Sequence, residues 1–159
     1  KNFKILLESL NKLKIKDISL ICFGGEKFNQ NDFELIKSKI EIIHINGNDD
    51  ILLSLIKNAL CFINPSLYEG FGIPNLEAMN SECPTICSNT EVFREICDDG
   101  ALYFDPIDSE SLANCIDMVI ENDQLRSDLK IKGKKRSEKF KWENCAKQTT
   151  DIYRKLINE

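Results

Sequence analysis

Short apolar runs alternate with helix-like stretches along almost the whole chain, and this alternation limits the possible folds more than any other feature. Most residues within each run are apolar, without polar alternation, which is typical of strands buried on both faces of a parallel sheet. The runs are Ile18–Phe23, Ile40–Ile45, Leu60–Asn64, Pro84–Ser88 and Ala101–Phe104. Helices between five such strands predict an α/β fold, a Rossmann-like doubly wound parallel sheet.

The stretches between these runs carry apolar stripes or start signals of helices. The residues Asp108 and Ser109 are both suitable caps for a helix that carries Leu112 to Ile120. The other predicted helices are Phe3–Leu13, Phe28–Lys39, Asp50–Asn58, Pro74–Asn80, Asp123–Lys139 and Trp142–Leu156. Doubly wound domains usually open with a strand, whereas this chain opens with a helix, so we expect a first strand to be missing.

Size and charge restrict the class of protein further. The 159 residues suit one domain spanning 1–159, and a net charge of −5 argues against nucleic acid as a partner. One basic run, Lys130–Arg136, is predicted to be a solvated helix face, with contact to a membrane surface or partner domain as the alternative. The seven cysteines show no disulfide framework and the only histidine is His44, so we expect reduced core cysteines, a cytoplasmic protein and no metal site.

The segment Asn64–Asn80 (NPSLYEGFGIPNLEAMN) follows a predicted strand, where ligands bind in open α/β sheets. Gly70 and Gly72 let the backbone approach a ligand, and the loop amides before the helix attract anions such as phosphate. Those amides belong to Phe71, Gly72 and Ile73. Glu69 and Glu77 flank them and can accept hydrogen bonds from sugar hydroxyls. These residues are typical of a nucleotide-sugar site, although glycine-rich turns before helices also occur as purely structural elements.

A longer set of motifs resembles one known family. The string Pro65–Pro74 (PSLYEGFGIP), with Leu76–Met79 (LEAM) after it, closely resembles the signature of the retaining glycosyltransferases of family 4. The spacing of Glu69 and Glu77 matches that family's E-x7-E motif. The resemblance continues, in the family's order, in Pro84–Asn89, Glu95–Ile96, Gly100–Pro106 and Phe140–Glu143, and Lys1–Asn2 is similar to the family's entry to its first helix.

The resemblance implies roles for individual residues. Glu69 would be the catalytic residue that contacts the transferred sugar, and Glu77 would bind the ribose of the donor. Lys1 would bind the diphosphate. Further substrate contacts would come from Gly24, Ile45, Gly70, Phe71, Gly72 and Ile73, with Ile45 near the nucleobase.

The resemblance also implies what the whole protein does. It would be the C-terminal half of a GT-B glycosyltransferase that moves a hexose from a nucleoside diphosphate sugar to an acceptor hydroxyl, in polysaccharide or glycoconjugate synthesis. The acceptor would be a glycan or lipid-linked sugar, bound by an N-terminal domain absent from this chain, so the isolated fragment would be inactive. No metal or other cofactor is expected. The protein would be cytoplasmic, with the missing domain able to hold it at the inner membrane face. The alternative is a non-catalytic nucleotide-binding module of Rossmann type.

Overall fold

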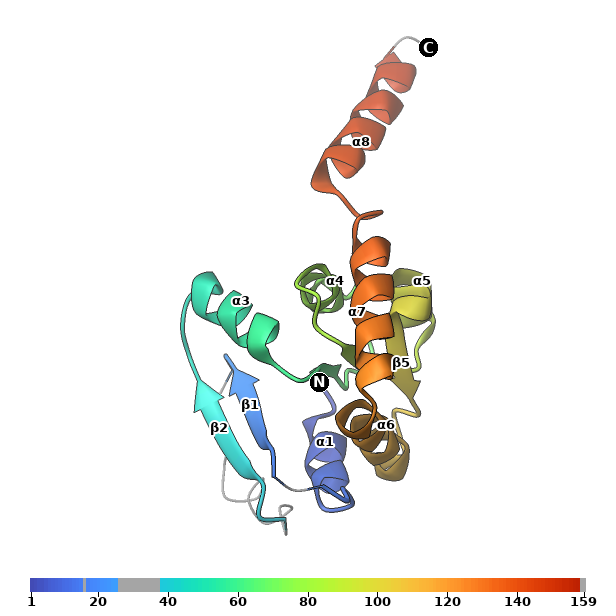
Figure 1. Cartoon of the computed structure of the whole chain (residues 1–159). Coiled ribbons are helices and arrows are strands. Elements are labelled where there is room, and N and C mark those ends of the chain that lie inside the picture. The colour runs from blue at the N-terminus through green and yellow to red at the C-terminus, as the bar shows by residue number, and fades with distance from the viewer. Residues whose placement is uncertain (16, 26–37, 158–159) are drawn as a thin grey trace.

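The computed structural model describes residues 1–15, 17–25 and 38–157, which form an α/β domain with a long helix projecting from it (Figure 1). The helices are α1 (Phe3–Leu10), α3 (Asp49–Asn58), α4 (Ile73–Asn80), α5 (Glu91–Cys97), the 3-10 turn η1 (Asp98–Gly100), α6 (Ser109–Glu121), α7 (Asp123–Ser137) and α8 (Trp142–Ile157). The strands are β1 (Ser19–Phe23), β2 (Glu41–Ile45), β3 (Phe62–Asn64), β4 (Thr85–Ser88) and β5 (Ala101–Phe104).

All five expected strands are present, and every pair between neighbours is parallel, which confirms the α/β class. Among the described residues the strands form two parallel sheets. One sheet pairs β1 with β2, and the other has the order β3-β4-β5. The apolar runs identify strands, but they carry no information about which strands become neighbours.

The central strand β4 shows how the three-stranded sheet is covered. Successive side chains of a strand point to opposite faces. Ile86 accordingly packs into the core formed mainly by α1 and α6, whereas Cys87 packs with Phe93 and Met79 on the opposite face. Helices α4, α5 and α7 contact one another on that second face. The sheet β3-β4-β5 is therefore buried between two layers of helices.

The helix α7 lies close to the body because glycine removes the side chain at the contact. Gly133, in the interior of α7, faces Gly100 so closely that a Cβ on Gly100 would lie 2.9 Å from the Gly133 Cα. Two side chains of the basic run then hold the end of α7. Lys134 Nζ donates to the Asn80 carbonyl at 2.8 Å, and Arg136 Nε donates to the Ile96 carbonyl at 2.9 Å. These cations therefore stabilise the fold as well as facing solvent.

Three other expectations need correction or remain open. The strands β1 and β2 are only partly buried, with Ile21 44% exposed, although burial on both faces was expected. The helix α5 was not predicted, because seven residues give too little periodicity to recognise. Most of the helix predicted at Phe28–Lys39 lies outside the described residues.

The cysteines and the last helix complete the description. All seven cysteines are free thiols, and four of them are buried. The amphipathic helix α8 is present as predicted, but none of its residues is buried, and it points away from the body (Figure 1). Among the helices formed by the described residues, none has the length and apolar character needed to cross a membrane.

Candidate functional site

A buried polar network fixes the loop between β3 and α4. Asn64, the last residue of β3, donates through Nδ2 to Asn75 Oδ1 at 2.9 Å, and its own Oδ1 accepts from the Ser66 backbone N–H at 3.3 Å. Asn75 Nδ2 in turn donates to Cys97 Sγ at 3.5 Å. All four residues are buried. Because unpaired polar groups in the interior are costly, this network favours a single conformation of the loop.

Gly72 sits at the junction of loop and helix and is required there for two reasons. Its φ of 92° is rarely adopted by residues that carry a side chain. A Cβ at this position would also lie 2.8 Å from the Phe93 ring, which is fully buried beneath it. Helix α4 therefore starts at Ile73, directly after this turn, and Pro74 occupies its second position rather than the expected first.

The outer side of the loop offers room and unused hydrogen-bond donors. A Cβ at Gly70 would have no atom within 4 Å, and the Phe71 and Ile73 residues are both 45% exposed. Within the described part of the chain, no hydrogen bond uses the backbone N–H of Phe71, Gly72 or Ile73. Together with the positive end of the α4 dipole, these amides can bind an anionic group.

Phe71 also links the loop to the segment that leads into α8. Its ring lies edge-on to the Phe140 ring, with centroids 5.9 Å apart and an interplanar angle of 81°. The Arg136 guanidinium lies over the Phe140 ring, 5.0 Å from its centroid. The half-exposed Phe71 ring thus has an aromatic packing partner outside the loop.

Glu69 is held by two donors at the start of this loop. Lys1 Nζ lies 2.5 Å from Glu69 Oε1, and Ser66 Oγ donates to the same oxygen at 2.9 Å. The Lys1 side chain is 78% exposed, whereas that of Glu69 is 21% exposed. The hydrogen bonds from Lys1 and Ser66 lower the pKa of the Glu69 carboxyl, so the carboxylate is ionised near neutral pH.

This geometry predicts the acid titration of Glu69. Because its pKa is lowered in the folded chain, ionised Glu69 stabilises the fold at neutral pH, and that contribution is lost as the pH falls through the lowered pKa. A carboxyl 13C NMR titration should give a midpoint below the usual value of about 4.3. The variants Lys1→Gln and Ser66→Ala should each raise it, and an unchanged midpoint in both would contradict the assignment of these donors.

The ends of β1 and β2 bring a second group of expected residues together. The Gly24 backbone N–H donates to the Ile45 carbonyl at 2.9 Å, so these two residues are direct neighbours. His44 Nε2 lies 2.9 Å from the Gly24 carbonyl oxygen. Gly24 and Gly25 both have positive φ, 70° and 74°, and turn the chain away at the end of the strand.

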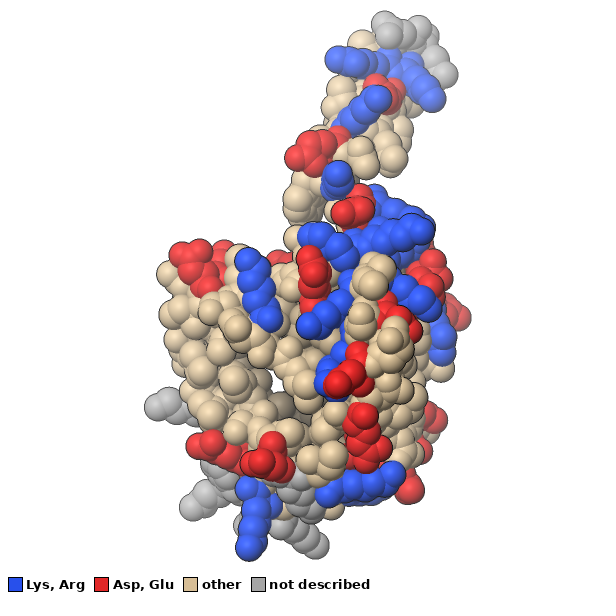
Figure 2. Space-filling model, in the orientation of Figure 1, with Lys and Arg blue, Asp and Glu red and all other residues tan. Residues whose placement is uncertain are grey.

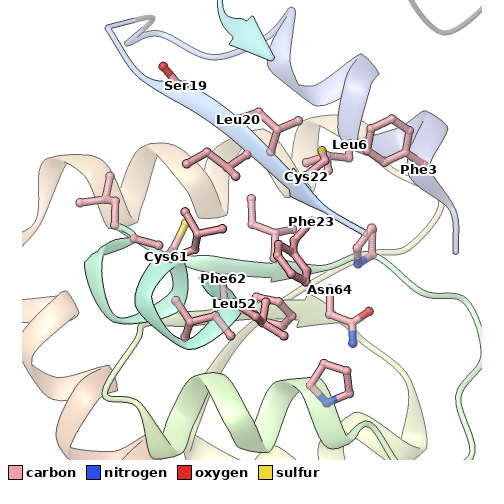
Figure 3. A pocket seen from close by; sticks show the side chains of 18 of the residues that line it. Phe3, Leu6, Ser19, Leu20, Cys22, Phe23, Leu52, Cys61, Phe62 and Asn64 are labelled. Carbon is pink, nitrogen blue, oxygen red and sulfur yellow. The ribbon is translucent and has the colours of Figure 1, made fainter. Parts of the chain in front are cut away.

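A large open cavity of about 1100 Å³ connects the two groups. Figure 2 shows the hollow between the part that contains β1, β2 and α3 and the rest of the molecule. Lys1, Gly24 and Glu77 line it, together with His44 and Ser66. Glu69 reaches the same place through its contact with Lys1, whereas Gly70 to Ile73 and Ile45 do not line the cavity. Most of the deeper lining is apolar, as Figure 3 shows for Leu6, Leu20, Phe23 and Phe62.

Several residues of the site were not singled out from the sequence. Ser66, Asn75, His44 and Phe140 received no individual role there, because each acts by contacts to partners that only the folded chain brings close. Among the residues that the structure describes, no group of three or more His, Cys, Asp or Glu side chains could hold a metal ion. Metal independence remains a prediction, because this arrangement does not test it.

Comparison with known proteins identifies relatives of the chain. Residues 1–136 match the family profile described as Glycosyl transferases group 1. The O-antigen chain mannosyltransferase B of Escherichia coli is 37% identical over 108 residues, which cover 68% of this chain and 28% of that protein. The O-antigen chain mannosyltransferase RfbU of Salmonella typhimurium is 40% identical over 85 residues, covering 54% and 24%. The chain thus spans about a quarter of the length of these two curated relatives.

Solved structures share the fold at lower sequence identity. Sucrose-phosphate synthase from Thermosynechococcus elongatus superimposes with a TM-score of 0.83 at 24% identity, over 99% of this chain and 43% of that one. Anabaena HepE in complex with UDP-glucose gives a TM-score of 0.82 at 19% identity, over 95% and 44%. These likenesses confirm the Rossmann-like fold expected from the sequence.

Proposed function

The chain belongs to the glycosyl transferases group 1 family, and from that membership we propose that it is the donor-binding domain of a retaining glycosyltransferase of family 4. The full-length protein transfers a hexose from a nucleoside diphosphate sugar to an acceptor hydroxyl on a glycan or lipid-linked sugar. The observation that carries this proposal is the arrangement at the carboxyl ends of the strands. Lys1 and Glu77 line one open cavity there, Glu69 contacts Lys1, and the loop between Glu69 and Glu77 carries the unused amides.

Each part has a chemical use in such a transfer. The amides of Phe71, Gly72 and Ile73 stabilise the charge that develops on the departing diphosphate, as preorganised donors do for oxyanions. Lys1, largely exposed, exchanges its contact with Glu69 for a contact with the diphosphate when donor binds. Glu69 then holds hydroxyls of the transferred sugar, and Glu77 holds the ribose. Transfer proceeds without a bound metal, since these cationic and amide groups neutralise the leaving group.

The wider setting of the protein is part of the same proposal. An N-terminal domain binds the acceptor and completes a GT-B enzyme, in line with the small share of each relative that this chain covers. Two relatives carry the name O-antigen chain mannosyltransferase, which supports a role in polysaccharide or glycoconjugate synthesis and makes mannose the first sugar to test. Seven free cysteines fit a reducing, cytoplasmic location, with membrane contact through the N-terminal domain.

Donor binding to the full-length protein tests the proposal. Glu77→Ala should weaken the binding of a nucleoside diphosphate by about 1–3 kcal/mol, because a charged hydrogen-bond acceptor for the ribose is lost. Isothermal calorimetry measures this, after a thermal-shift screen of UDP-, GDP- and ADP-sugars, including GDP-mannose and UDP-glucose, has identified the nucleotide.

A matched control separates the ribose contact from a general loss of negative charge. Glu121, exposed at the end of α6 and outside the cavity, provides it, and Glu121→Ala should bind donor as the parent protein does. Equal affinity of Glu77→Ala and Glu121→Ala would refute the site. Donor binding without sugar transfer in the full-length protein would favour the alternative, a non-catalytic nucleotide-binding module.

A further inference from the structure

Gly70 and Phe71, in the middle of the loop between β3 and α4, make no hydrogen bond to another described residue. The bond between Asn64 and Asn75 fixes only the two ends of this segment, at β3 and in α4. Gly70 and Gly72 flank Phe71, and glycine leaves the backbone more conformational freedom than any other residue. The position of the Phe71 amide therefore depends on what holds the Phe71 side chain.

Phe140 provides that support and is itself part of the body of the domain. The Phe71 ring lies edge-on to the Phe140 ring, with centroids 5.9 Å apart. Phe140 packs against the buried cluster that contains Met79 and Phe93. Its backbone N–H also donates to the Ser137 carbonyl at 3.0 Å, in the turn that follows α7. Phe140 thus connects the exposed loop with the core beneath it.

Arg136 in turn fixes the place of the Phe140 ring. The guanidinium lies over that ring, 5.0 Å from its centroid, and the Arg136 side chain is only 17% exposed. Three groups of α5 and η1 hold the guanidinium: the carbonyls of Ile96 and Glu95, which accept hydrogen bonds, and the Asp98 carboxylate at 3.6 Å. A cation held in this way attracts the face of the ring and favours one ring position.

We propose that Phe140, backed by Arg136, is a positioning residue that keeps the amides of Phe71 and Gly72 directed at the leaving diphosphate. Phe140 lies outside the cavity lining that the structure describes, and it acts through the Phe71 ring. That role rests on the proposed function, in which these amides neutralise charge that develops during transfer. Such donors are effective because they are already in place when the charge appears, so a loose loop lowers the rate.

The order of the loop amides tests the positioning without any donor. In the deuterated full-length protein, 15N relaxation should give order parameters of about 0.85 for the amides of Phe71 and Gly72, as in rigid backbone. Phe140→Ala should lower both below about 0.6, whereas Phe140→Tyr keeps the ring and should leave them unchanged. Val92→Ala is the structural control, because Val92 packs against the same buried cluster from α5. Its order parameters should equal those of the parent protein.

Steady-state transfer by the full-length protein tests the consequence for the reaction. Phe140→Ala should lower kcat at least about tenfold and change the KM for the donor less than about threefold, because the affected amides act mainly in the transition state. Phe140→Tyr should restore the parent kcat, and Val92→Ala should keep it.

A double-mutant cycle separates positioning from a general loss of packing. Phe71→Ala removes a half-exposed side chain, so this variant folds even where Phe140→Ala does not, and it should lower kcat as much as Phe140→Ala. The double variant should lose no more than either single variant, because both substitutions remove the same contact.

Several results would overturn the proposal. These are unchanged order parameters in both single variants, a loss of kcat in Val92→Ala equal to that in Phe140→Ala, a loss expressed in KM alone, and additive losses in the double variant. A parent protein that neither binds donor nor transfers sugar would instead refute the proposed function. The order parameters would then still decide whether Phe140 positions the loop.

Discussion

In the full-length protein, Glu69→Gln is expected to lower the rate of sugar transfer about 100-fold or more. Glutamine keeps the size of the side chain but loses the charge that Lys1 and Ser66 now hold in place. If Glu69 keeps the donor sugar in its reacting position, a small displacement of that sugar is enough for such a loss. The measurement is steady-state transfer with the identified donor and acceptor, and the change should appear in kcat.

The matched variant Glu77→Ala should behave differently in the same assay. A ribose contact is present before and during reaction, so its loss should raise KM with little change in kcat.

Both assays are run with and without EDTA, and equal rates are expected because transfer is proposed to need no metal. Transfer by Glu69→Gln at the parent rate, with folding intact, would contradict the catalytic role of Glu69.

Gly72→Ala is expected to destabilise the domain by about 3 kcal/mol, as the sum of backbone strain at positive φ and overpacking against Phe93. For a domain of 159 residues this corresponds to a fall in melting temperature of roughly 6–12 °C, measurable by circular dichroism.

Gly70→Ala is the control within the same loop. Its Cβ would meet no atom within 4 Å, and its φ is not positive, so the melting temperature should change by no more than about 1 °C. If Gly72→Ala melted at the same temperature as Gly70→Ala, the tight turn before α4 would be described wrongly.

The sequence was sufficient where local chemistry decides the structure. Asp108 caps α6 as one of the two expected residues, with its carboxylate accepting from the Glu110 N–H. The motif around Gly72 predicted the loop and the start of α4 within one residue. The contact of Lys1 with Glu69 spans 68 positions of the chain, and no local pattern predicted it.

The sequence was insufficient where contacts between distant segments decide. An apolar run fits any central position in a sheet, so the runs do not reveal that β1 pairs with β2 while β3, β4 and β5 form a second sheet. The hydrogen bond between Asn64 and Asn75, like the ring contact of Phe71 with Phe140, requires the completed fold. Polar residues such as Asn75 appear suited to a surface until the structure shows them fully buried with partners.

The residues that fix the loop before α4 differ from those that it exposes to solvent. The buried hydrogen bond between Asn64 and Asn75 fixes the loop, while the Leu67 and Tyr68 residues are 55% and 86% exposed. Substitutions at these two exposed positions leave that hydrogen bond intact and should change the folding free energy little. The residues at these two positions can therefore change while the conformation of the loop is kept.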